Sequence, residues 1–202
     1  MLDGHGTGHY YDYREVKEHA GREFPFNIYP CSIPLDFKQV QVHWHKELEI
    51  ISVKKGRGVV TVDMEPLRVQ AGEAVVIFPG QLHGISQSGQ EVMEYENIIF
   101  RLSMLMTTQE DVCTADFLQP LSQGQAYSPI HIREGMDIYQ HVMDGIHYMD
   151  ILCKDKAYGY QLGVKGVLFL LLGLLSEDNI PAGGERLRKS REKMKLILEY
   201  IE

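Results

Sequence analysis

Cysteine is scarce in this chain of 202 residues. The three cysteines, Cys31, Cys113 and Cys153, lie far apart, and no C-x-x-C pair occurs. Small secreted domains held together by disulfides show dense cysteines in even number, so this pattern argues against a disulfide framework. We therefore expect reduced thiols and a cytoplasmic protein.

Long hydrophobic runs and an excess of positive charge are also lacking. The longest apolar run, residues 167–175, has nine residues, which is too short to cross a bilayer. Residues 1–13 lack the basic-then-apolar order of a secretory signal. The formal net charge of −8 disfavours binding to the negatively charged phosphates of nucleic acids. We expect no membrane association and no specific DNA binding by these residues alone.

Three of the nine histidines lie in a β-type stretch, residues 43–83. Residues two apart in a strand share a face, so His43, His45 and Glu49 project to one side. His83 follows a Pro-Gly turn, and in a small barrel the four side chains would converge. Imidazole and carboxylate suit Zn²⁺, Ni²⁺, Fe²⁺ or Mn²⁺. The same four side chains could instead line a ligand pocket without a metal, so no cofactor is assigned.

Residues 40–101 indicate one short strand after another. The glycines of the stretch 54–58 predict a hairpin turn between strands at 48–53 and 59–63. Short strands at close spacing predict a sandwich or barrel. On the strand at 92–102, Tyr95 and Asn97 share a face and are candidate ligand contacts. Alternation leaves open whether that face lines a pocket or fills the core.

The chain changes character after residue 103. Apolar residues at three-and-four spacing predict helices at 136–153 and 158–176. The later half of the second helix is apolar on every side, so a barrel alone would not cover it, and we expect a homodimer. The alternative is that residues 104–125 fold back over it. The predicted dimer interface consists of Leu168, Leu171, Leu172, Leu174 and Leu175.

The C-terminal residues indicate a linker followed by a helix. Residues 181–186 are rich in proline and glycine, which is typical of a linker. Residues 191–202 begin a basic amphipathic helix that stops in mid-pattern. We therefore expect a further domain beyond this chain.

Two motifs resemble those of the cupin superfamily. His43, His45, Glu49 and Gly56 match its first motif without a gap, and Gly72, Pro79, Gly80 and His83 match its second loosely. The second motif departs from the family because Pro79 stands directly next to its glycine. The resemblance implies a mainly β fold with C-terminal helices: a cupin-like double-stranded β-helix, or jelly-roll barrel, followed by an α-helical hairpin.

The order of segments resembles the regulatory half of AraC/XylS-type transcription regulators. Residues 43–49, 72–83 and 194–202 resemble, in that order, the sensor opening, a later sensor segment and the start of the first DNA-binding helix. The implied organisation is an N-terminal arm at 1–23, a ligand-binding barrel at 24–103, a helical dimerisation region at 104–178, a linker at 179–190 and the start of a truncated helix-turn-helix domain at 191–202.

The resemblance implies a non-enzymatic function. A small effector, expected to be a carbohydrate, would contact His43, His45, Glu49, His83, Tyr95 and Asn97, and DNA would be bound only through the missing C-terminal domain. The alternative is a small metal-dependent cupin enzyme, a dioxygenase or isomerase. Fold by itself does not decide between them; the linker and the final helix favour the regulator.

Overall fold

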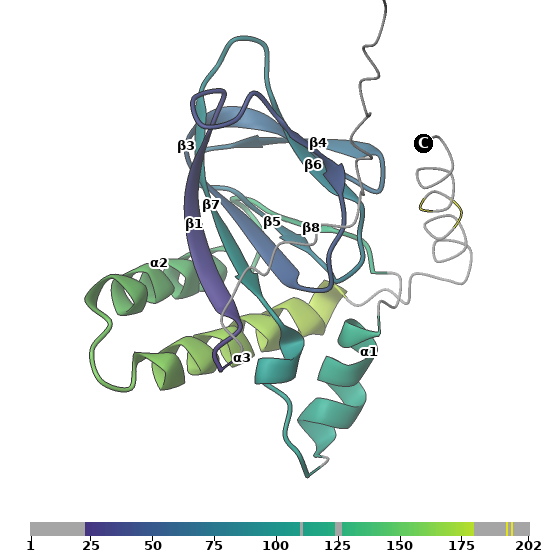
Figure 1. Ribbon diagram of the computed structural model, residues 1–202, viewed down its shortest axis with the longest axis vertical. Helices are drawn as coiled ribbons and strands as arrows, with labels where there is room; N and C mark the ends of the chain where they lie inside the picture. The colour runs from purple at the N-terminus through teal and green to yellow at the C-terminus, as the bar shows by residue number, and fades with distance from the viewer. Residues whose placement is uncertain (1–22, 110, 124–126, 180–192, 194, 196–202) are drawn as a thin grey trace, which may run out of the picture.

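The computed structural model describes residues 23–109, 111–123, 127–179, 193 and 195. The predicted arm, linker and final helix therefore lie almost entirely outside the described residues. The described part is an antiparallel barrel with helices packed on one side of it (Figure 1). This confirms the predicted fold class of a barrel followed by a helical hairpin.

Two sheets form the barrel, and they share one long strand. The first sheet has the order β1-β7-β3-β5-β8, and the second joins β2, β6, β3 and β4. Every pairing is antiparallel. The strands are β1 (Phe26–Ile33), β2 (Val40–His43), β3 (Leu48–Val62), β4 (Glu65–Gln70), β5 (Ala74–Ile77), β6 (His83–Gln87), β7 (Met93–Phe100) and β8 (Ile130–Ile132).

The stretch 54–58 is not a hairpin turn, contrary to the sequence prediction, because β3 runs straight through it. A register shift between Val53 and Lys55 marks a bulge there, where β3 passes from one sheet to the other. Gly56 has a φ of +71°, and a Cβ at this position would collide with the carbonyl oxygen of Val92. The glycine thus permits a close approach between strands rather than a reversal.

The reversal comes at the end of β3 instead. Asp63 and Met64 have φ values of 48° and 71°, and two successive residues with positive φ are typical of a type I′ hairpin turn. Neither residue is a glycine. The sequence indicates a reversal here only through Pro66, which the structure places in β4 rather than in the turn.

The helices follow β7 and pack beside the first sheet. They are η1 (Leu102–Met104), the π-helical η2 (Cys113–Leu118), α1 (Gln119–Ser122), α2 (Tyr139–Asp155) and α3 (Tyr160–Asn179). Helices α2 and α3 form the predicted hairpin (Figure 1). The predicted domain boundary at residue 103 does not coincide with the end of the sheet, because β8 pairs with β5. In the part of the chain that the structure describes, no helix is long and apolar enough to cross a membrane.

Alternation along β3 divides the core into two clusters. Leu48 and Ile50 face the helices and pack in one cluster with α2 and α3. Ile51 and Val53 face the barrel interior and pack with residues of β5, β6 and β7. One strand therefore supports both the helical layer and the walls of the barrel interior.

The leucines predicted at a dimer interface are mostly buried within the single chain. Their exposed fractions are 0% for Leu168, 1% for Leu171, 8% for Leu172 and 4% for Leu175, and Leu174 is half-buried. The prediction was wrong for these four side chains, because the chain's own barrel, α2 and α1 cover them. The exposed apolar residues of α3 are instead Leu162, Phe169 and Leu170.

Candidate metal and ligand site

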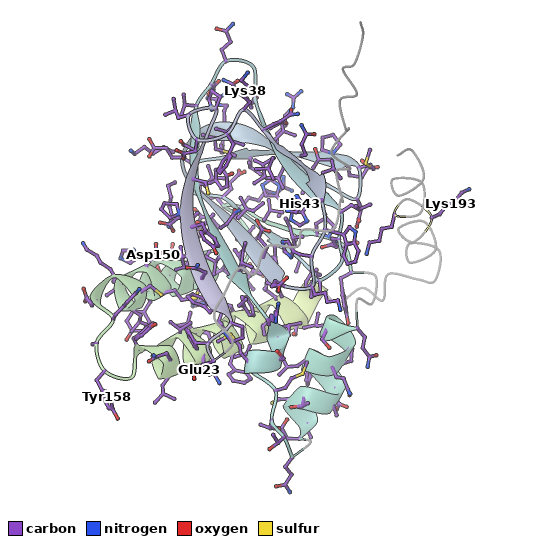
Figure 2. The ribbon with its side chains drawn as sticks, in the orientation of Figure 1. Glu23, Lys38, His43, Asp150, Tyr158 and Lys193 are labelled. Atoms are coloured by element: carbon purple, nitrogen blue, oxygen red, sulfur yellow. The ribbon has the colours of Figure 1, made fainter. Side chains whose placement is uncertain are left out.

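Three histidines and one glutamate meet inside the barrel, as their spacing predicts. His43 ends β2, His83 begins β6, and the two are cross-strand partners; Glu49 comes from β3 and His45 from the segment before it. His45, Glu49 and His83 are buried, and His43 is half-buried. The ligand atoms of the three imidazoles lie within 4.8 Å of one another. Figure 2 shows His43 in the interior of the barrel.

Backbone carbonyls set the orientation of all three imidazole rings. The Nδ1 atoms of His43 and His83 each lie 2.9 Å from the carbonyl oxygen two residues earlier. Nδ1 of His45 lies 3.2 Å from the carbonyl oxygen of Glu47. A carbonyl only accepts hydrogen bonds, so each Nδ1–H donates to it and Nε2 is left for the site. Metal-binding histidines are oriented by this kind of hydrogen bond.

Glu49 lies at the centre of the cluster. Its Oε2 is 2.9 Å from Nε2 of His45 and 3.1 Å from Nε2 of His83. Burial by itself would raise the pKa of this carboxyl group. The positive charge of His83, together with the hydrogen bonds from both rings and the charge of His45, outweighs burial and holds the pKa well below its usual range.

The donor set fits a divalent cation. Without a cation, the carboxylate of Glu49 requires N–H donors, so His45 and His83 would each have to donate from both ring nitrogens. A bound cation removes that requirement, because each Nε2 can then offer its lone pair. Three imidazoles and one carboxylate suit Zn²⁺, Ni²⁺, Fe²⁺ or Mn²⁺. His43, His45, His83 and Glu49 are the residues that would hold it.

Acid is expected to destabilise the fold through Glu49. A carboxyl group whose folded pKa is lowered contributes stability above its ordinary pKa of 4.5, and this stability is lost as the pH falls below that value. Urea unfolding of metal-free protein between pH 7 and pH 3 measures the loss. Glu49→Gln should show a shallower pH dependence over this range than the unmodified protein. Glu65→Gln, on the exposed side of β4, should keep the original one. If the free energy of unfolding fell equally with pH in all three proteins, the pH dependence would not come from Glu49.

An ion pair that the sequence did not indicate lies beside His45, whose Nδ1 is 3.7 Å from Oε2 of Glu47. Glu47 is 7% exposed, and its Oε1 accepts a hydrogen bond of 2.8 Å from Nε of Arg101. Burial raises the pKa of Glu47, but the hydrogen bond from Arg101 and the charge of His45 outweigh it, and the net shift is downward. Because Arg101 lies 54 residues away, no local pattern could have paired the two.

A cavity of about 480 Å³ opens beside the cluster. His43, Glu49, Tyr95 and Asn97 are among its lining residues, so the shared face of Tyr95 and Asn97 is the cavity face. The Tyr95 hydroxyl and the Asn97 side-chain oxygen are buried and have no aligned hydrogen-bond partner among the described residues. Burial, then the neighbouring Cys31 and Glu49, raise the pKa of Tyr95, so the phenol stays neutral. Buried polar atoms left unpaired are costly unless a ligand or water satisfies them.

The comparison with protein families identifies the barrel. Residues 35–100 match the family described as "Cupin domain". This part of the chain is a cupin domain, and the predicted double-stranded β-helix is confirmed.

A curated relative is longer than this chain. It is the "Uncharacterized HTH-type transcriptional regulator YdeC" of Bacillus subtilis (strain 168), 20% identical over 159 residues, which are 78% of this chain and 54% of the relative. The chain therefore spans about half the length of the curated relative it matches.

Solved structures of cupins resemble the barrel. A cupin protein from Bacteroides fragilis is 26% identical, covering 45% of this chain and 71% of that chain, with a TM-score of 0.31. A Cupin 2 conserved barrel domain protein from Salinispora arenicola CNS-205 is 23% identical, covering 41% and 68%, with a TM-score of 0.36. A predicted oxalate decarboxylase from Thermotoga maritima is 22% identical, covering 38% and 64%, with a TM-score of 0.31.

Proposed function

We propose that this chain is the ligand-sensing part of an AraC-type transcription regulator, with a small effector bound in the cupin cavity. The observation that carries the proposal is the cavity itself, with two buried oxygen atoms, of Tyr95 and Asn97, left without aligned partners. The helical hairpin after the barrel and the similarity to a helix-turn-helix regulator support it. DNA would be bound by a domain beyond this chain, since the net charge here is −8.

The cavity chemistry favours an uncharged, hydroxyl-rich effector such as a carbohydrate. Among the described residues that line the cavity, none is a lysine or arginine, whereas Asp36 and Glu49 are acidic. An anionic effector would therefore find no lysine or arginine partner in the cavity wall and would lie beside two carboxylates. Tyr95 and Asn97 offer the few polar groups that orient a ligand in a largely apolar cavity.

A thermal-shift screen of neutral sugars and related polyols tests the proposal. An effector at a hundred times its Kd stabilises the fold by about 2.7 kcal/mol, which raises Tm by roughly 2–4 °C in a domain of this size. For any hit, Asn97→Ala should weaken binding by about tenfold, the effect of one lost hydrogen bond. Gln140→Ala, an exposed residue of α2, should bind normally. A hit that binds both variants with unchanged affinity would place the effector site elsewhere.

We also propose that the chain forms a homodimer through the exposed side of α3. Leu162, Phe169 and Leu170 are 77%, 42% and 56% exposed. Phe169 also borders an apolar cavity of about 420 Å³ between η2, α1 and α3. Among the described residues, η2 and α1 do fold back over α3, with Leu118 and Leu121 buried in the same cluster, but they leave Leu162, Phe169 and Leu170 exposed. A regulator that reads paired half-sites needs two copies at a set separation.

Sedimentation at micromolar concentration is expected to show a dimer of the 23.1 kDa chain. Leu170→Asp should shift the equilibrium to monomer, because a charge would be buried in an apolar interface. Met64→Asp, at the exposed β3–β4 turn, is the matched control and should remain dimeric. A monomer near 23 kDa for the unmodified chain would contradict the proposed dimer. A dimer unaffected by Leu170→Asp would show that the interface does not include the exposed side of α3.

The alternative function is a small metal-dependent cupin enzyme, a dioxygenase or isomerase. The observation in its favour is the convergence of three imidazoles and Glu49 beside the cavity. A metal bound there would supply a Lewis acid to a substrate oxygen. Turnover of a cavity-binding compound by metal-loaded protein would support the enzyme, whereas binding that leaves the compound unchanged would support the regulator.

A further inference from the structure

A polar cluster connects the barrel to α2. Nζ of Lys54 in β3 lies 2.7 Å from Oε2 of Glu96 in β7 and donates a hydrogen bond of 2.8 Å to Oδ2 of Asp150 in α2. Ser52, which is fully buried, is the cross-strand partner of Glu96. Figure 2 shows Asp150 on α2 next to the barrel. We call Ser52, Lys54, Glu96 and Asp150 the α2 joint.

The α2 joint is incompletely satisfied. The Ser52 hydroxyl and Oδ1 of Asp150 are buried oxygens without an aligned hydrogen bond among the described residues, whereas Oε2 of Glu96 is held by its ion pair with Nζ of Lys54. Two carboxylates share the ammonium group of Lys54, and burial, with the charge of Asp150, raises the pKa of Glu96 despite that ammonium group. A polar contact with several near-equivalent acceptors can rearrange at a smaller cost than a packed apolar one.

The same strand that carries Glu96 lines the effector cavity. Successive residues of a strand face opposite sides, so Tyr95 and Asn97 face the cavity while Glu96 between them faces α2. Lys54 is the extra residue of the bulge in β3, where the register shifts between Val53 and Lys55. A displacement of β7 at the cavity wall therefore moves Glu96 directly. Glu96 lies next to the part of β3 where the strand register already shifts.

We propose that the α2 joint transmits occupancy of the cavity to α2. The identity of the occupant rests on the proposed function; the transmission itself does not. Filling the cavity moves β7, Glu96 changes its position relative to Lys54, and Asp150 with the C-terminal half of α2 responds. Helix α2 packs on α3 through Gly145 and Leu171, so the response reaches the helix whose exposed face we assign to the dimer.

Amide hydrogen exchange of the ligand-free chain tests this. Asn97→Phe places a ring in the cavity permanently and stands in for an occupant. Exchange in residues 146–155 of α2 is expected to change by on the order of threefold or more. In the Lys54→Met background, Asn97→Phe should produce no further change there. Tyr139→Phe removes a separate hydrogen bond between α2 and the barrel, to the carbonyl oxygen of Gly72, and should leave the effect of Asn97→Phe intact.

Two results would overturn the proposal. One is unchanged exchange in residues 146–155 on filling the cavity; the other is an equal change with Lys54→Met present. If Asn97→Phe does not fold, Ile99→Phe fills the same cavity from the same strand. Because no effector is added, a failed sugar screen would count against the proposed function alone, and a failed exchange experiment against the α2 joint alone.

Discussion

Protein incubated with Zn²⁺ and passed through a desalting column is expected to retain the ion, and His45→Ala and His83→Ala are each expected to lose it. Both side chains are almost fully buried, and each Nε2 faces Glu49. Removing an outer-shell partner of a metal ligand typically costs about 10–100-fold in affinity, so removing a ligand itself should cost more. Elemental analysis of dialysed protein and a competition titration with a chelator measure the loss.

The control for this experiment is His147→Ala. His147 lies on the exposed side of α2, so its loss should leave the retained metal unchanged. Equal metal content in the two site variants and the control would show that these imidazoles do not hold the ion. The affinity of the unmodified protein should also fall with acid, because protons compete with the metal for imidazole and carboxylate.

Leu171→Ala is expected to lower the free energy of unfolding by about 2–5 kcal/mol. Leu171 is 1% exposed, and a Cβ added to Gly145 of α2 would come within 2.9 Å of its Cδ2 atom. The α2–α3 contact is therefore close-packed around this side chain, and truncation leaves a cavity that neighbouring backbone cannot readily fill. Urea unfolding with circular dichroism measures the change.

The matched control is the adjacent residue, Leu170, which is 56% exposed. Leu170→Ala should change the free energy of unfolding by no more than about 0.5 kcal/mol when measured on the monomer. A similar loss for both variants would mean that Leu170 is covered by a partner even at low protein concentration. A negligible loss for Leu171→Ala would contradict the packing of α2 on α3.

Local patterns predicted much of this fold because they depend on periods of a few residues. The spacing of His43, His45 and Glu49 and the Pro-Gly turn before His83 predicted that the four side chains converge, and the structure brings them together. The predicted reason was incomplete, because β2 ends at His43 and β3 begins at Leu48, so the three residues do not lie along one continuous strand. The three-and-four spacing predicted helices at 136–153 and 158–176, close to the observed α2 and α3. The helix positions follow from side-chain direction, which neighbouring residues already determine, whereas the convergence of the four site residues also needs the pairing of β2 with β6.

Features that depend on distant partners were decided only by the tertiary structure. Gly56 permits the approach of Val92 rather than a turn, and this depends on a residue 36 positions later, just before β7. The ion pair between Glu47 and Arg101 spans 54 residues. The later half of helix α3 is apolar all round, so its sequence did not determine which leucines the chain's own barrel would cover. Alternation placed Tyr95 and Asn97 together, but the closure of the barrel made their shared face the wall of a cavity.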